Sequence, residues 1–269
     1  MPRSRPPLPY LFIDDEQRTL SEIERILSEG AFREMFPAVV RLGQIGDGNK
    51  RRPTIHEFTC EMEGGLLAVF RADEHGIPQA YSQVPVASHS ARHHGAFVAS
   101  HSMGVDLCPA SSRRKHPTLG QGTLTALIFG EPFLQVDMAT HGRKTVARRV
   151  TRRPTALAEA YLFDYAVGSG QRVESSFIVD GSGFVVSQCH HEAFSWTENR
   201  RLEMAFRNTP RSVSQAYWHA FISLLSGPYR ERLGVILKAL GACEMETFFS
   251  TYDTVCRKRL IGETQIEVV

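Results

Sequence analysis

An arginine-rich segment is the most distinctive stretch of this 269-residue sequence. The segment RKTVARRVTRRP, residues 143–154, holds six cationic side chains and no acidic one, while the whole chain has a formal charge of only +2. These cationic residues are Arg143, Lys144, Arg148, Arg149, Arg152 and Arg153. Guanidinium groups bind phosphate oxygens bidentately, and each neutralised phosphate of a polyanion releases counterions. We therefore predict that the segment binds the phosphates of a nucleic acid.

A second basic cluster lies upstream, in the segment SSRRKH of residues 111–116. It contributes Arg113, Arg114 and Lys115, which we predict to extend the phosphate-binding surface. Between Arg92 and Pro154 there are ten Lys and Arg residues against three acidic residues, a net charge of +7, so the remainder carries about −5. Charge concentrated in one region indicates an anionic partner. A solvated surface, or ion pairs with acidic residues elsewhere, would account for the same cluster.

The arginine-rich segment fits a helix better than a strand. As a helix it places pairs of arginines four residues apart, with Val146 and Val150 as a thin apolar stripe. As a strand it mixes both valines with cationic side chains on one face, which makes a poorer core face. We therefore expect a helix with one exposed cationic face.

Histidines are concentrated between residues 89 and 116, in a region that otherwise has few structure signals. The histidines there are His89, His93, His94, His101 and His116, with Asp106 and Cys108 among them. Imidazole, thiolate and carboxylate are the ligands of zinc, but no spacing here matches a known zinc motif. We predict a loop-rich region over 86–122 and assign no metal. The alternative use of these histidines is a polar pocket for a small substrate.

Two further histidines are candidates for acid–base catalysis. His141 lies just before the arginine-rich segment, where it could assist phosphodiester cleavage by a neighbouring 2′-hydroxyl. His190 lies in the cluster CHHE, at the end of the predicted strand 184–189. The sequence contains no Walker A, GxGxxG or GxSxG motif, so no cofactor is predicted. Whether the protein is an enzyme stays open at this stage.

The elements that must position these residues indicate an α+β fold, with a strand-rich N-terminal and central body and a helical C-terminal portion. Thr19 and Glu22 form a capping box that begins a helix, which could continue to Phe36. The segment 54–62 alternates as a strand, and residues 172–190 are typical of a hairpin around the turn DGSG. A helix is expected over 154–168, a stretch that also fits a strand. Further helices are expected over 199–207, 212–225, 229–240 and 244–257. We divide the chain into a mixed body, 1–197, and a helical portion, 198–269, which could be one domain.

Composition suits an ordinary globular protein: 42% of residues are hydrophobic and 22% are charged. No apolar run is long enough for a signal peptide or a membrane span, and the five cysteines form no CxxC pair. We therefore expect a cytoplasmic protein without a membrane partner.

The leading prediction is a nucleic-acid-binding protein, with RNA slightly favoured over DNA. It would be a subunit or processing factor of a ribonucleoprotein complex, with nucleic acid and other protein subunits as partners. One alternative is a small-substrate enzyme with a His-rich pocket, including a metal-dependent hydrolase. Another is a protein-binding scaffold.

Overall fold

The folded chain divides into two units that each draw on separate stretches of sequence. Unit 1 comprises Met1–His94 and Ala110–Leu127, and unit 2 comprises Gly95–Pro109 and Ile128–Val269. The structure, a computed structural model, describes residues 12–13, 16–41, 54–75, 88–104, 107–128, 130–132, 134–137, 144–148, 155–169, 177–180, 185–188, 190, 193–195, 211–222, 228–240, 242–261 and 264–269. The predicted division at residue 198 stays a prediction, because it concerns which parts fold independently.

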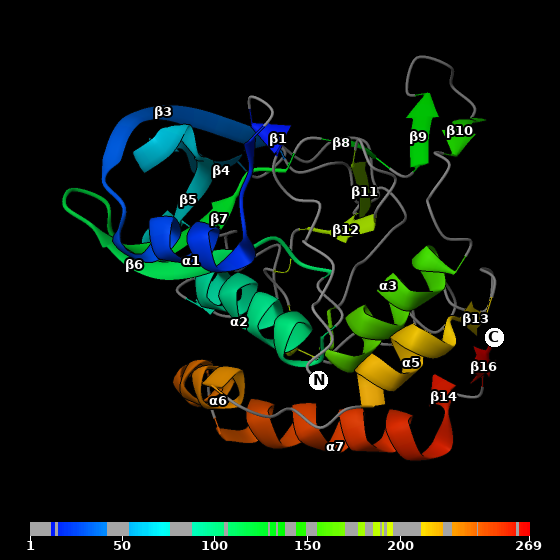
Figure 1. Ribbon diagram of the computed structural model, residues 1–269. Helices are drawn as coiled ribbons and strands as arrows, with labels where there is room; N and C mark the ends of the chain where they lie inside the picture. Colours follow the sequence, from blue (N-terminus) through cyan, green and yellow to red (C-terminus); the bar gives the residue numbers. More distant parts are fainter. Residues whose placement is uncertain are drawn as a thin grey trace. The chain divides into compact units, whose positions relative to one another are not determined.

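Unit 1 is built on a five-stranded antiparallel sheet with the strand order β3-β4-β5-β7-β6 (Figure 1). The strands are β3 (Phe32–Arg41), β4 (Thr54–Met62), β5 (Leu67–Ala72), β6 (Ser111–His116) and β7 (Gly120–Ala126). Along β5, half-buried and buried positions alternate, so that Ala68, Phe70 and Ala72 lie in the core. The short 3₁₀ helices η1 (Glu63–Gly65) and η2 (Asp73–His75) follow β4 and β5.

Helix α1 (Leu20–Glu29) packs on this sheet at β6 and β7. The predicted cap is confirmed, since the Thr19 hydroxyl accepts a hydrogen bond from the Glu22 amide at 3.2 Å. Ile23, Ile26 and Leu27 form its buried face. The expected continuation of the helix to Phe36 is wrong, because the helix ends at Gly30 and the chain enters β3. Two short strands, β1 (Phe12–Ile13) and β2 (Glu16–Gln17), pair before the helix.

The predicted loop-rich region 86–122 is wrong over its described residues. It contains helix α2 (His89–Ser102), which the unit boundary divides between His94 and Gly95, and then β6 and the start of β7. The sequence of α2 has little apolar periodicity because much of its buried surface is polar. Its buried polar residues are His89, Ser90, Arg92, His94, Ser100 and His101. Such residues are buried only where hydrogen bonds satisfy them, and the partners of Ser90 and His94 lie at least 17 residues away in the sequence.

Unit 2 contains the predicted hairpin, formed by β11 (Phe177–Asp180) and β12 (Val185–Ser187), with β8 (Gly130–Pro132) beside β11. Helix α3 (Ala156–Ala166) confirms the helix predicted there, and nearly all of its residues are buried. A helix that is apolar on most sides belongs in the interior of a protein.

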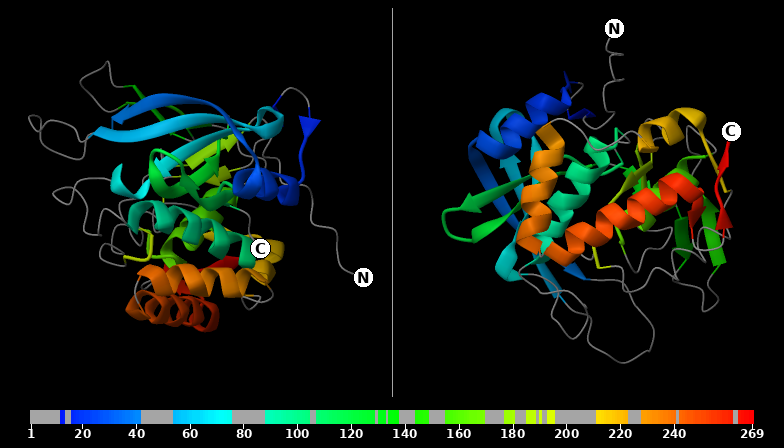
Figure 2. Two further views of the ribbon diagram at one scale, coloured as in Figure 1. Left: turned by 90° about the vertical axis from the view of Figure 1, so that its left-hand side faces the viewer. Right: turned by 90° about the horizontal axis from the view of Figure 1, so that it is seen from below.

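The C-terminal part of unit 2 is mainly helical, as predicted. Its helices are α5 (Gln215–Ile222), α6 (Pro228–Leu240) and α7 (Ala242–Lys258), and α6 packs against α7 (Figure 2). The short strands β14 (Leu260–Ile261), β15 (Thr264–Gln265) and β16 (Glu267–Val268) follow, and β16 pairs in parallel with β13 (Ser212–Val213). The helix predicted over 199–207 lies outside the described residues. The α+β fold class is therefore confirmed.

The helix predicted over the arginine-rich segment is wrong where the structure describes it. Lys144–Arg148 forms strand β10, which pairs antiparallel with β9 (Leu134–Asp137) across a register shift between Thr145 and Ala147. Pairing with a partner strand satisfies the backbone and overrides the local helical spacing. Thr145 and Val146 are β-branched and favour this conformation.

No helix among the described residues is long and apolar enough to cross a membrane.

Candidate functional site

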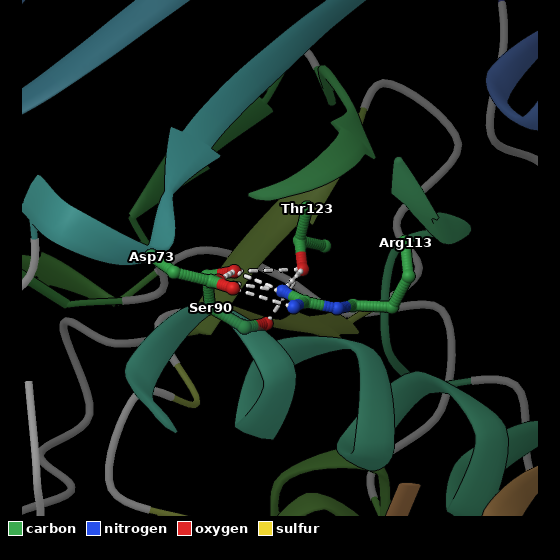
Figure 3. Close-up of polar contacts among 4 residues, drawn as sticks. All are labelled: Asp73, Ser90, Arg113 and Thr123. Carbon is green, nitrogen blue, oxygen red and sulfur yellow. Dashed lines mark hydrogen bonds and ion pairs between the residues drawn. The ribbon is translucent and has the colours of Figure 1, made fainter. Parts of the chain in front are cut away.

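A cluster of four polar side chains in unit 1 joins four elements of the fold through hydrogen bonds and an ion pair (Figure 3). The Arg113 guanidinium on β6 donates to both carboxylate oxygens of Asp73, at 2.7 Å from Nη1 to Oδ1 and 2.6 Å from Nη2 to Oδ2. The same Nη1 donates to the hydroxyls of Ser90 and Thr123. We call Asp73, Ser90, Arg113 and Thr123 the Arg113 clamp. It joins η2, α2, β6 and β7.

The hydroxyls of the clamp have assignable roles. Ser90 Oγ donates to Asp73 Oδ1 at 2.5 Å, and Thr123 Oγ1 donates to the Ser90 carbonyl oxygen at 2.7 Å. Both hydroxyl oxygens are therefore left to accept from Arg113. Ser90 and Thr123 are buried, whereas the side chains of Arg113 and Asp73 are 24% and 19% exposed. The clamp is thus a bidentate, charge-assisted arrangement with most of its surface removed from water.

A second ion pair lies in the same sheet. Arg71 Nε on β5 donates to Glu57 Oε1 on β4 at 2.5 Å, with both side chains largely buried. Arg71 is the penultimate residue of β5, and Asp73 follows that strand directly. The sequence signals neither pair, because each partner lies at least 14 residues from its arginine.

The basic cluster of residues 113–115 mostly faces partners inside unit 1. Arg113 belongs to the clamp, and Arg114 donates from Nη1 to the Gly30 carbonyl oxygen at 2.5 Å. The Arg114 guanidinium also lies 4.6 Å from the centre of the Phe32 ring, a cation–π contact. Lys115 is exposed on β6. Two of these three side chains are therefore used to hold unit 1 together.

The arginine-rich segment is described only in part. Lys144 and Arg148 lie at the two ends of β10. The other predicted phosphate-binding residues, Arg143, Arg149, Arg152 and Arg153, lie outside the described residues, as does His141.

The five histidines between residues 89 and 116 all lie in a helix or a strand. His89, His93, His94 and His101 lie on α2, and the Nδ1 atom of His94 is 3.0 Å from Ser111 Oγ on β6. His116 ends β6, and its Nδ1 atom accepts from the backbone amides of Thr118 and Leu119 at 3.2 Å. Burial, and then the charge of Arg114, lower the pKa of His116. The described residues contain no group of three or more His, Cys, Asp or Glu that could hold a metal.

His190 lies in a buried polar network of unit 2. Its Nε2 atom is 3.3 Å from Cys108 Sγ, and its Nδ1 atom is 3.3 Å from Ser169 Oγ and 3.8 Å from Asp164 Oδ1. Ser187 Oγ donates to the same Asp164 oxygen at 3.2 Å. All of these side chains are buried, so the network has little access to a substrate. The catalytic role of His190 stays a prediction.

Comparison with solved structures identifies the architecture. The Golgi casein kinase superimposes with a TM-score of 0.53 at 10% identity, over 96% of this chain and 78% of that chain. Its complex with Mn and ADP gives a TM-score of 0.52 at 10% identity, over 88% and 74%. Hydra Fam20 with sugar gives 0.53 at 10% identity, over 95% and 93%. The chain has a kinase-like fold. No protein-family model and no curated protein matches the sequence.

This fold overturns the predicted nucleic-acid-binding function. The RNA or DNA partner and the place in a ribonucleoprotein complex are wrong, since the fold is shared with a kinase that was solved with ADP and Mn. The contacts give a physical reason. Arg113 and Arg114 are engaged within unit 1, and the described part of the segment expected to present a cationic helix, Lys144–Arg148, forms strand β10 instead.

Proposed function

We propose that this chain is a kinase-fold protein that acts by binding and does not transfer phosphate. Protein kinases place a Lys on the third strand of the sheet, where it contacts the α- and β-phosphates of ATP and pairs with a Glu of the following helix αC. The proposal rests on the residues that this chain has on its third strand and on the helix that follows it.

The third strand of the sheet along this chain is β5, and its sequence LAVFRA contains no lysine. Its cation is Arg71, which already pairs with Glu57 of the adjacent strand. Arg differs from Lys in shape and hydration, so it does not replace a phosphate-binding Lys in a site built for a point charge. An Arg71 side chain that paired with a nucleotide would have to leave Glu57 largely buried and unpaired.

The next described helix, α2, offers no partner for a catalytic lysine. Its sequence HSARHHGAFVASHS contains no Asp or Glu. The Lys–Glu ion pair must be in place for protein kinases to be active, and among the described residues β5 supplies no Lys and α2 supplies no Glu. The sequence also lacks the H-R-D and D-F-G tripeptides, which supply the catalytic base and a magnesium ligand in protein kinases.

The test is a phosphoryl-transfer assay with radiolabelled ATP and either Mg²⁺ or Mn²⁺, on the chain alone and with casein as acceptor. We expect no incorporation above a protein-free blank, while an active protein kinase labels casein in the same buffer. An Arg71→Met variant provides the decisive comparison. Incorporation by the wild-type chain that Arg71→Met abolishes, while circular dichroism shows that the variant is still folded at the assay temperature, would show that the chain is a kinase.

Binding without transfer is measured separately, by the shift of the thermal unfolding midpoint with ADP and Mn²⁺. A ligand that binds only the native state stabilises it according to its concentration relative to Kd. A shift without phosphate incorporation would identify a nucleotide-binding, non-catalytic protein. No shift would point to binding of a protein instead.

The cytoplasm remains the compartment that we propose. Among the described residues, Cys60 and Cys256 form no disulfide. Reduced cysteines suit a reducing compartment, in contrast to the disulfides typical of secreted domains.

A further inference from the structure

The first turns of α2 are fixed to the sheet of unit 1 by contacts that involve no ligand. Ser90 lies in the first turn of α2, and three partners from three other elements reach it: Asp73, Arg113 and Thr123 (Figure 3). Two of these contacts use its hydroxyl as donor and acceptor, and Thr123 holds its carbonyl. The beginning of the helix is therefore tied through both side chain and backbone.

One helical turn later, a second contact ties the same face. His94 follows Ser90 by four residues, so the two side chains project from one side of α2. The His94 ring lies 3.0 Å from Ser111 Oγ, and both residues are buried. Ser111 and Arg113 are alternate residues of β6 and share a face of that strand. Strand β6 thus supplies a hydrogen-bonding partner to each of the first two turns of α2, Arg113 for Ser90 and Ser111 for His94.

We propose that the Arg113 clamp holds the beginning of α2, residues 89–94, docked on the sheet of unit 1 in the absence of nucleotide, and so takes over the task of a Lys–Glu ion pair that β5 and α2 do not supply. The inference rests on the proposed function, because it concerns a kinase-like fold without that pair. In protein kinases the position of the corresponding helix is the regulated quantity. In this chain the position is set by the fold of unit 1 itself.

The identity of the central cation matters to this proposal. Arg113 contacts four acceptor atoms on three residues with one planar group, and it does so bidentately on Asp73. A Lys at this position keeps the charge but has one compact ammonium group, so it cannot span the same acceptors. Arg113→Lys therefore separates the geometry of the clamp from its charge.

Hydrogen exchange measured by mass spectrometry tests the clamp on the full chain. The wild-type protein should show slow exchange in peptides that cover residues 89–95, with the same rate with and without ADP and Mn²⁺. In Arg113→Lys, exchange in these peptides should rise about tenfold or more, the size expected when one charged hydrogen bond is lost. Peptides from β4 and β5 should keep their rates.

Two further variants make the outcome decisive. Lys115→Ala is the matched control, since Lys115 is exposed on the same strand, and it should exchange like the wild-type chain. Ser90→Ala removes only the hydroxyl on the helix side and should accelerate exchange over 89–95 even if Arg113→Lys proves too unstable to measure. Rates in Arg113→Lys and Ser90→Ala that match Lys115→Ala would overturn the proposal.

The comparison of exchange with and without ADP and Mn²⁺ can also contradict the proposal. If ADP and Mn²⁺ slow exchange over 89–95 in the wild-type chain, the helix is docked by ligand and the clamp does not fix it. This readout is independent of phosphoryl transfer. Transfer without a change in α2 exchange would refute the proposed function and leave the clamp standing as a structural anchor.

Discussion

Gly95 of α2 lies directly against the ring of Phe194 in unit 2. A Cβ atom built on Gly95 would come within 2.8 Å of Cε2 of Phe194 and within 3.3 Å of Ile236. Phe194 is fully buried and packs edge-on against Phe248 at 5.7 Å between ring centres. Its φ of 65° falls in the left-handed region, which is rare for a bulky residue. Phe194 therefore has little freedom to give way to a larger neighbour.

Gly95→Ala should destabilise the protein by about 1–2 kcal/mol. Overpacking a well-filled core costs roughly 1–3 kcal/mol, and the better helix propensity of Ala returns up to about 1 kcal/mol. Urea unfolding followed by circular dichroism measures the change. Gly234→Ala on α6 is the matched control, since nothing lies within 4 Å of an added Cβ there. It should be neutral or stabilising, and equal effects of the two variants would contradict the close packing at Phe194.

Ser214→Ala should cost about 2–3 kcal/mol of unfolding free energy. The Ser214 hydroxyl donates to buried Glu159 at 2.7 Å and accepts from the Tyr217 amide at 3.2 Å, which caps α5. A hydrogen bond to a charged group contributes about 1.5–3 kcal/mol and a cap about 1 kcal/mol. The control is Ser212→Ala, whose hydroxyl contacts Glu267 near the surface. It should change stability by less than about 0.5 kcal/mol.

Cys60 and Cys256 should react very slowly with a thiol reagent. Burial raises the pKa of Cys60 to about 11 and that of Cys256 to about 11. At pH 8 only about one in a thousand such thiols is ionised, against roughly a quarter of unperturbed thiols. Iodoacetamide labelling resolved by peptide mass spectrometry should therefore be at least about a hundredfold slower at both residues than in the urea-unfolded chain. Equal rates in the folded and unfolded chain would contradict their burial.

His116 should make the turn between β6 and β7 sensitive to acid. Its folded pKa lies below the ordinary value of 6.5, so the unfolded chain takes up a proton first as the pH falls. The contribution of His116 to stability is therefore present above about pH 6.5 and is lost below it. A protonated ring also cannot accept from the Thr118 and Leu119 amides. An NMR titration should give a His116 pKa below 6.5, and a value above 6.5 would show that these contacts do not favour the neutral ring.

Local signals in the sequence predicted the elements whose determinants are local. The cap of α1 depends on Thr19 and Glu22, three residues apart, and the paired strands β11 and β12 lie close together in the sequence. Helix α2 was missed because many of its buried side chains are polar, and the partners of Ser90 and His94 are distant in the sequence. Strand β10 was mistaken for a helix because its pairing with β9 is invisible in its own spacing.

The candidate site was predictable only in part. Arg113 could be singled out from the basic cluster, but its interpretation depended on Asp73, which lies 40 residues away. Nothing in the spacing of the two residues links them. The function was misread for the same reason, since a cation that is paired inside the fold looks identical in the sequence to one that faces a ligand.

The division of the chain between the two units has a consequence for synthesis on the ribosome. Unit 1 needs Ala110–Leu127 to complete its sheet, and Gly95–Pro109 belongs to unit 2. The sheet of unit 1 therefore cannot close until residue 127 has left the exit tunnel. By then a stretch of unit 2 has already emerged and must wait for the rest of its core. The nascent chain consequently exposes apolar surface of α2 for the time needed to translate the second half of the protein. Chaperones that bind exposed apolar segments should act on the chain during this period.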